Sequence, residues 1–294
     1  MHSAKKAVVY ALISVLLWST VGTAFKLSLR YLSPIELLLF SSLFSCVVLG
    51  IILVYQSKWR LIFQCSRNEY LLSILLGFLN PFLYYLVLFK AYDLLPVQQA
   101  QPINYTWAIT LTLLSIPLLN QKLHWYQVLA LVISYAGVFI ISTKGKPLDL
   151  EFTSLLGVSL ALLSTVVWAL YWIFNTRNRR DPVVALFINF IFSLPFIIAY
   201  YLLAVEPKLV PVKGLIGAAY VGFFEMGICF VMWLLAMKLS NSTARISNLI
   251  FISPFLSLIF ARYILDESIV SGTYVGLILI VIGLLVQQIK VKSG

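Results

Sequence analysis

The chain has 294 residues, of which 62% are hydrophobic and 11% charged, and its net charge is +11. Soluble domains are about 45–50% apolar and about 25% charged, so a water-soluble fold of this size could not bury so much apolar surface. The composition therefore predicts an integral membrane protein. The positive charge would also suit a nucleic-acid-binding protein. However, the lysines and arginines stand at the ends of apolar stretches, as membrane topology requires, and we expect no nucleic-acid partner.

Ten continuous apolar stretches follow one another along the chain. Crossing the hydrocarbon core takes about 20 apolar residues, and the stretches approach or exceed that length. They lie at about 7–25, 34–55, 71–91, 97–118, 125–142, 154–174, 183–204, 214–236, 244–264 and 269–288. They differ from the short alternating segments of an outer-membrane barrel. We therefore expect an all-α integral membrane protein with ten transmembrane helices.

The first stretch follows Lys5 and Lys6 and has two interpretations. A basic start before an apolar run is typical of a secretory signal peptide. This run is longer than a signal-peptide core, and no small-x-small cleavage site ends it. We expect it to remain as the first transmembrane helix.

A motif in the first stretch recurs in the sixth. Residues 11–18 read ALISVLLW and residues 161–168 read ALLSTVVW, so Trp18 and Trp168 occupy matching places. Glycines match in the same order further along, and the chain divides into two similar halves with five apolar stretches each. An odd number of crossings turns the second copy over in the membrane.

The repeat predicts the domain organisation. We expect two inverted five-helix repeats, residues 1–143 and residues 153–294, joined by a linker at residues 144–152. Such a pair of bundles can open a shared central cavity to one side of the membrane and then to the other. This is the usual construction of a secondary transporter, whose substrate site lies near the midplane.

The basic residues predict the orientation. Cytoplasmic loops are enriched in Lys and Arg. With the N-terminus inside, the two dense clusters fall on the cytoplasmic side: Lys58, Arg60 and Arg67 in one, and Arg177, Arg179 and Arg180 in the other. We expect a multi-pass protein of the cell inner (plasma) membrane with both termini cytoplasmic.

Glu225 lies near the middle of an apolar stretch, in GFFEMGICF. A carboxylate at that depth costs about 2.5–3.5 kcal/mol on insertion scales, so it should face a cavity or a partner. Its function would be to carry a coupling proton or to oppose a substrate amine. Alternatively, it is a protonated carboxyl that only bonds a neighbouring helix. Asn80 stands at the matching place of the first half and would share a central site with it.

The stretch at 97–118 begins with dense polarity for a membrane helix. Gln101, Asn104 and Tyr105 are spaced i, i+3 and i+4 and therefore share one helix face, while Pro102 can kink the helix. These features predict a face on a water-filled cavity. The alternative is hydrogen bonding between helices that only holds the bundle together. Asn248 lies on the corresponding stretch of the second half.

Deep aromatic side chains complete the predicted site. Most aromatic residues near helix ends form the interfacial belt, but some lie deeper and could stack on a substrate or cation. For each of them ordinary packing is the alternative. The full set of predicted substrate-binding residues is Trp18, Asn80, Tyr84, Gln101, Asn104, Tyr105, Trp168, Trp172, Glu225, Trp233 and Asn248.

These pieces together resemble the EamA-type permeases of the drug/metabolite transporter superfamily over nearly the whole chain. The segments that carry the resemblance are Trp18, LNPFLYYLVLFKAYDLLPVQQAQPINYTW at 79–107, GFFEMGICFVMWLLAM at 222–237, ISNLIFISPFLSLIF at 246–260 and DE at 266–267. The resemblance implies ten helices in two inverted halves around a central cavity. It also implies export of amino acids or other small metabolites, and NYTW resembles the aromatic amino-acid exporter branch.

Two positions depart from the family pattern. Ala108 stands after Trp107 where proline is frequent, although Pro254 has the matching place in the second half. Gln121 replaces an acidic residue that is frequent before the final helix of the first half. The two halves are therefore expected to differ at their ends.

The predicted function is secondary-active transport of a small metabolite, most simply export of amino acids or related compounds, with proton coupling at Glu225. The alternatives are multidrug or cation efflux and a nucleotide-type metabolite permease. A membrane enzyme is a distant alternative because His2 and His124 are the only histidines and no catalytic motif occurs. A channel lacks a repeated pore motif. We expect no cofactor or metal, a lipid bilayer and a small molecule as partners, and a monomer or dimer.

Overall fold

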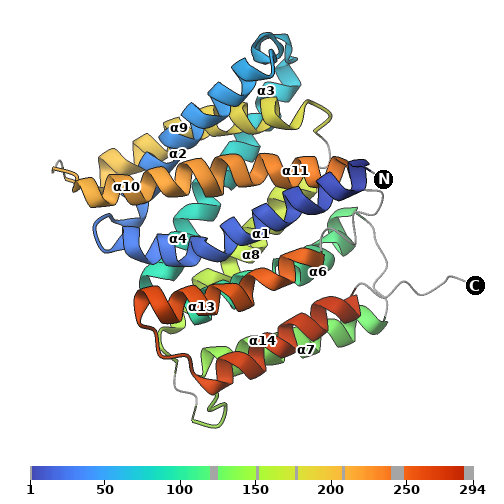
Figure 1. The fold of residues 1–294 in the computed structure, drawn as a ribbon, viewed down its shortest axis with the longest axis vertical. Helices are drawn as coiled ribbons and strands as arrows, with labels where there is room; N and C mark the ends of the chain where they lie inside the picture. Colours follow the sequence, from blue (N-terminus) through green and yellow to red (C-terminus); the bar gives the residue numbers. More distant parts are fainter. Residues whose placement is uncertain are drawn as a thin grey trace, which may run out of the picture.

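The computed structural model describes residues 2–119, 125–149, 152–175, 178–206, 209–239 and 248–287, and all regular elements within these ranges are helices (Figure 1). The first half of the chain contributes α1 (His2–Leu29), α2 (Pro34–Tyr55), η1 (Trp59–Gln64), α3 (Arg67–Gly77), η2 (Phe78–Leu83), α4 (Tyr84–Leu94), α5 (Val97–Asn104), α6 (Trp107–Leu119) and α7 (Trp125–Ser142). The second half contributes α8 (Leu155–Asn175), α9 (Pro182–Ala204), α10 (Val212–Tyr220), η3 (Val221–Cys229), α11 (Phe230–Leu239), η4 (Asn248–Ile252), α13 (Ser253–Leu265) and α14 (Ser271–Gln287).

Six helical segments are long and apolar enough to cross a bilayer. They are Lys5–Leu29, Pro34–Tyr55, Arg67–Leu94, Leu155–Asn175, Pro182–Ala204 and Val212–Trp233. Shorter apolar helices accompany them at Val128–Ser142, Ser253–Leu265 and Ser271–Val286. The all-helical membrane architecture is confirmed, whereas the count of ten transmembrane helices stays a prediction.

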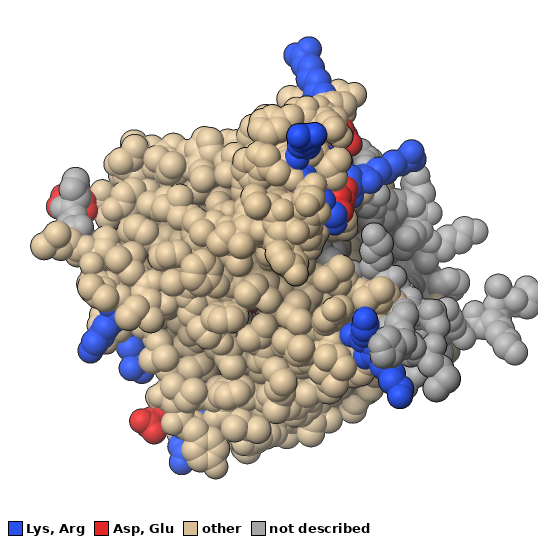
Figure 2. All heavy atoms as spheres, turned by 45° about the horizontal axis from the view of Figure 1, so that its top comes forward, with Lys and Arg blue, Asp and Glu red and all other residues tan. Residues whose placement is uncertain are grey.

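The distribution of side chains suits a lipid environment. Large apolar residues such as Leu16, Ile51 and Ile278 are exposed on the outer faces of the helices, while Ser41 and Ser164 are fully buried between them. The face shown in Figure 2 has its Lys and Arg at opposite ends, with a broad uncharged band between. Because hydrocarbon cannot hydrogen-bond, polar groups collect inside the bundle.

Two membrane segments contain a wide, π-helical turn in their middle. The first turn, η2, holds Asn80, whose backbone leaves the helix (φ −146°, ψ 119°), and Pro81, which has no N–H to donate. The second turn, η3, holds Glu225. Turns of this kind are frequent at functional sites, and both fall at the polar residues that the sequence analysis placed in matching positions.

The helix that Pro102 was predicted to kink is interrupted and continues as a second helix. Helix α5 ends at Asn104, two residues beyond the proline, and α6 begins at Trp107. Between them, the Thr106 N–H bonds the carbonyl of Ile103 at 3.1 Å, a tighter turn than the α-helix has.

The connections at one end of the bundle are joined by an ion pair between the halves. Asp181 caps α9 by accepting the N–H groups of Val183 and Val184 at 3.0 and 3.3 Å. The Lys58 ammonium, from the α2–η1 connection, lies 2.7 Å from the same carboxylate. Burial opposes the charged form of Asp181, but these bonds together hold its pKa below the ordinary value.

Helices of the two halves pack against one another at close glycine contacts. Gly77 of α3 lies against the backbone of Asn189 in α9, and Gly222 of η3 lies against the backbone of Ser41 in α2. At both glycines the absence of a side chain lets the two helices approach closely. Helices α7 and α14 form a separate pair, seen at the lower edge of Figure 1, in which Gly137 lies against Gly276.

These contacts predict that the loss of stability caused by an added methyl group depends on which glycine is replaced. A Cβ at Gly77 or Gly222 would overlap a backbone atom of the neighbouring helix, whereas a Cβ at Gly50 would meet only the Phe187 ring at 3.6 Å. We expect Gly77→Ala and Gly222→Ala each to destabilise the protein by about 1–3 kcal/mol. Gly50→Ala should be neutral or stabilising. Thermal unfolding in detergent measures this, and equal midpoints for all three variants would contradict the packing described.

Candidate substrate-binding cavity

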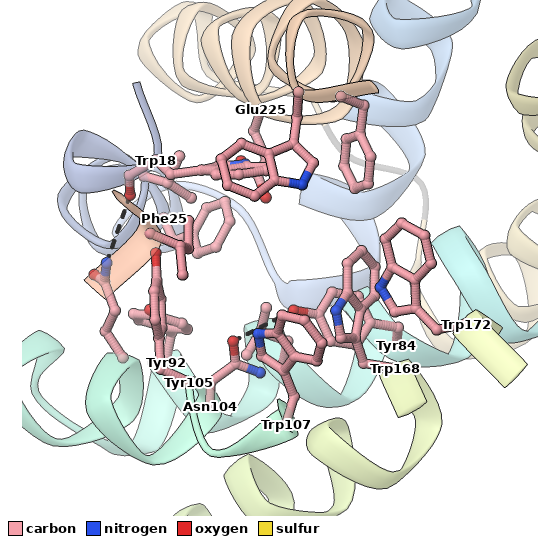
Figure 3. Close-up of a pocket in the computed structure, with 16 residues that line it drawn as sticks. Trp18, Phe25, Tyr84, Tyr92, Asn104, Tyr105, Trp107, Trp168, Trp172 and Glu225 are labelled. Atoms are coloured by element: carbon pink, nitrogen blue, oxygen red, sulfur yellow. Dashed lines mark hydrogen bonds between the residues drawn. The ribbon is translucent and has the colours of Figure 1, made fainter. Parts of the chain in front are cut away.

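A cavity of about 100 Å³ lies between helices of both halves (Figure 3). Its walls come from α1, α4, α5 and α6 of the first half and from α8, η3 and α11 of the second. This volume is smaller than that of typical small-molecule sites, which take about 300–1,000 Å³, so a bound metabolite would require the two halves to move apart.

Most of the predicted site residues meet in this cavity. Those that line it are Trp18, Tyr84, Gln101, Asn104, Tyr105, Trp168, Trp172, Glu225 and Trp233. The side chain of Asn248 lies outside the described residues. Asn80 is fully buried and is not part of the lining. Its turn instead brings it beside α8 and α9, where the hydroxyl of Tyr171 faces it.

Aromatic rings form two walls of the cavity. On one side, the ring centroids of Trp18 and Trp233 are 5.1 Å apart. On the other, Trp168 lies 4.6 Å from Tyr84 and 6.0 Å from Trp172. The matching tryptophans of the sequence repeat, Trp18 and Trp168, thus stand on α1 and α8 and face one space. Such walls can hold an apolar or aromatic body or a cation.

The predicted polar face of α5 points into the cavity. Asn104 donates through Nδ2 to Ser164 at 2.8 Å and accepts from the Tyr84 hydroxyl at 3.4 Å. The Tyr105 hydroxyl donates to Ser253 at 2.7 Å. Gln101 lines the cavity, and its buried Oε1 has no partner among the described residues. The face therefore both holds helices together and leaves hydrogen-bonding capacity for a ligand.

Glu225 is the one charged side chain among the described residues that line the cavity. Its side chain is 8% exposed. Oε1 accepts a hydrogen bond from the Tyr85 hydroxyl at 3.0 Å, and the Trp18 side chain lies beside the carboxyl. The buried Oε2 forms no hydrogen bond of standard geometry in the described part of the chain. Leaving a buried polar atom unpaired costs about 1–3 kcal/mol. A proton or a cationic ligand would recover that cost.

Several residues that line the cavity were not predicted from the sequence. Phe25, Leu88 and Tyr92 line the cavity, as do Phe230 and Ile250. Trp107 also lines it, although the sequence singled it out only as the residue before Ala108. Tyr92 lies two turns beyond Tyr84 on α4, so helical spacing from Tyr84 was a signal for it. The others stand among many apolar residues of their kind.

A further contact joins the first turn of α5 to the second half of the chain. The Glu267 carboxylate accepts the backbone N–H groups of Val97 and Gln98 at 2.8 and 3.3 Å, so it caps the helix that carries Gln101 and Asn104. The Gln98 side chain accepts from Val270 N–H and donates to the Ser268 carbonyl, both at 3.0 Å. For Gln98 the interhelical interpretation therefore holds.

A helical membrane bundle with a polar and aromatic cavity between its halves has the architecture of a membrane transporter. The EamA-like transporter family matches residues 5–143 and again residues 155–287. The chain belongs to this family and is a multi-pass membrane transporter, which confirms the resemblance seen in the sequence.

Individual relatives agree with this assignment. An uncharacterized transporter of Archaeoglobus fulgidus is 24% identical over 95% of this chain and 97% of its own. The transporter YoaV of Bacillus subtilis, also uncharacterized, is 24% identical over 94% and 95%. A Clostridium kluyveri transporter is 25% identical over 60% of this chain and 58% of its own length. One crystal structure superposes with a TM-score of 0.67 at 21% identity, over 97% of this chain and 96% of that one, and shows the same fold.

The placement of tryptophans makes ligand binding measurable. Of the seven tryptophans, Trp18, Trp107, Trp168, Trp172 and Trp233 line the cavity, while Trp59 and Trp125 lie elsewhere and are 43% and 74% exposed. A ligand that fills the cavity should change the intrinsic fluorescence. A Trp59→Phe/Trp125→Phe variant should keep the full ligand-induced change. Loss of the change in that variant would place the binding site outside the cavity.

Proposed function

We propose that the protein is a secondary-active transporter that exports a small metabolite with an amino group, such as an amino acid or a related compound, in exchange for a proton. The observation that carries the proposal is Glu225, a buried carboxyl with one unpartnered oxygen that faces an aromatic cavity containing no other described charge. A protonated Glu225 and an amine bound to ionised Glu225 exclude each other, which is what exchange requires.

The rest of the cavity fits such a substrate. The amide of Gln101, with its free Oε1, and the amide of Asn104 offer hydrogen bonds to the polar end of a ligand. The rings of Trp18, Trp168 and Trp233 offer surfaces for an apolar or aromatic side chain. The amine would then lie at Glu225.

Two inverted repeats support alternating access as the mechanism. The family matches the chain twice, at residues 5–143 and 155–287. The glycine contact of α3 with α9 has its counterpart in the contact of η3 with α2, as a two-fold relation between the halves predicts. We propose that the repeats, residues 1–143 and 153–294, rock about the central cavity.

The orientation follows from charge. The end of the bundle where α1 begins is also where α9 begins (Figure 1), and Asp181 at the start of α9 pairs with Lys58 of the α2–η1 connection. Lys58, Arg67 and Arg180 belong to these connecting segments, in accord with the positive-inside rule. We propose that this end faces the cytoplasm, that both termini lie there and that the protein resides in the inner membrane. We propose outward transport because the sequence resembles that of exporters.

Efflux of lipophilic cations is a second candidate. A lone carboxyl within a box of tryptophans and tyrosines is also suited to a quaternary ammonium ion, which aromatic faces attract. The two candidate substrates differ in whether their binding requires the side-chain amides of the cavity. An amino acid requires hydrogen bonds from Gln101 and Asn104, so Gln101→Leu should weaken its binding while leaving tetraethylammonium binding unchanged.

Proton exchange predicts that a pH gradient drives transport. Liposomes containing the protein, acidic inside, should accumulate external substrate because protons leave as substrate enters. Glu225→Gln should reduce this accumulation by about 10-fold or more, since the amide neither binds nor releases a proton. Glu206→Gln, at an exposed carboxylate, is the matched control and should transport normally.

The readout is uptake of the labelled substrate identified by fluorescence. If folded Glu225→Gln protein accumulates substrate along the pH gradient as the wild type does, the coupling role is wrong. Flux that does not saturate with concentration would instead indicate a channel.

A further inference from the structure

A second cavity, of about 100 Å³, lies where α8 ends and α9 begins. It is separated from the central cavity by the rings of Trp172 and Phe230, because these two side chains line both spaces. In Figure 3, Trp172 stands at the edge of the central site beyond Trp168. A molecule moving between this end of the bundle and the central cavity can therefore pass by these two rings.

Arg180 gives this second cavity a positive charge that is held in place. Its Nε donates to Asn178 Oδ1 at 3.0 Å, and its Nη2 donates to the Ser73 hydroxyl at 2.7 Å. Its Nη1 is buried and has no partner among the described residues. A guanidinium fixed at two nitrogens with the third free is prepared to bind an anion.

The acidic groups near Arg180 are already engaged elsewhere. Asp181, the next residue, is paired with Lys58 at 2.7 Å and caps α9. Glu69 lies near enough to feel the charge of Arg180, but it is exposed and caps α3 through Ser66. Within the described residues, the charge of Arg180 thus has no ion-pair partner.

Groups that can donate hydrogen bonds also line this cavity. The indole N–H of Trp172 has no partner among the described residues. The buried Tyr171 hydroxyl lies near the amides of Asn80 and Asn189. Both the indole N–H and the hydroxyl can donate to a ligand that has acceptor oxygens.

We propose that this second cavity is a binding site for a small carboxylate, held by Arg180, by the indole N–H of Trp172 and by the Tyr171 hydroxyl. It serves as a vestibule in which a substrate carboxylate waits before or after the central cavity. This role rests on the proposed function, because it supposes a substrate that moves between the two cavities. A single cation among neutral amides matches one negative charge, so a carboxylate fits the lining better than a phosphate dianion.

Binding of butyrate to the purified full-length protein tests the site without any flux. Butyrate has the carboxylate but no amine, and butyramide is its neutral counterpart. In the Trp59→Phe/Trp125→Phe background, butyrate should change the fluorescence in a saturable way and butyramide should not. Arg180→Gln should raise the Kd for butyrate by about 10-fold or more, since it removes the charge-assisted hydrogen bonds. Arg179→Gln, at the exposed neighbouring arginine, should leave the Kd unchanged.

A second variant keeps the test valid if Arg180→Gln does not fold. Tyr171→Phe removes only the hydroxyl and keeps the ring, so the protein should fold, and its Kd for butyrate should still rise several-fold. Glu225→Gln should bind butyrate normally because no amine is involved, so failure of the coupling proposal would leave this result intact. Unchanged butyrate affinity in both Arg180→Gln and Tyr171→Phe would overturn the carboxylate site.

Two further binding measurements distinguish a carboxylate from other anions. Inorganic phosphate should bind more weakly than butyrate, and micelles containing phosphatidylglycerol should not displace butyrate. Tighter, Arg180-dependent binding of phosphate would overturn the assignment to carboxylates. Displacement by the anionic lipid would show that the cavity belongs to a lipid headgroup instead.

Discussion

The cost of placing the Glu225 carboxyl in the middle of a membrane helix determines how this molecule is built around it. Insertion of such a group costs about 2.5–3.5 kcal/mol, and the structure meets that cost only in part. Tyr85 donates to one carboxyl oxygen, and the central cavity faces the other. Gly222 and Gly227, on either side in sequence, lie against α2 and allow the wide turn η3 to pack closely there. The remaining free energy is available to a proton or to a substrate amine.

The two cavities have opposite charges, and the proposed transport route passes through both. The central cavity has a carboxyl, and the second cavity has the fixed guanidinium of Arg180, with Trp172 and Phe230 between them. An amino acid has an amine that can pair with the carboxyl and a carboxylate that can pair with the guanidinium. At the same end of the bundle, the Lys58–Asp181 pair and the Arg180–Ser73 hydrogen bond connect the two halves, so movement of the halves would change the second cavity directly. In this account, binding and conformational change act on the same residues.

Much of the site could be predicted because polar residues are rare in apolar helices. Glu225 and the face formed by Gln101, Asn104 and Tyr105 were visible for that reason, and the repeat pointed to Trp18 and Trp168. Asn80 was placed in the central cavity by its matching position, but the non-helical backbone of η2 puts it beside Tyr171 instead. Phe230 was indistinguishable from its apolar neighbours. The Glu267 cap on α5 joins residues 170 positions apart, which no local pattern reveals.

The central claim is that Glu225 exchanges its proton for a cationic substrate. Isothermal titration of substrate into the purified protein, in buffers with different ionisation enthalpies, counts the protons released on binding. The account predicts release from the wild type at a pH where free Glu225 is protonated, and none from Glu225→Gln. Substrate binding to the wild type with no proton release at any pH between 5 and 8 would contradict it, as would equal release from Glu225→Gln.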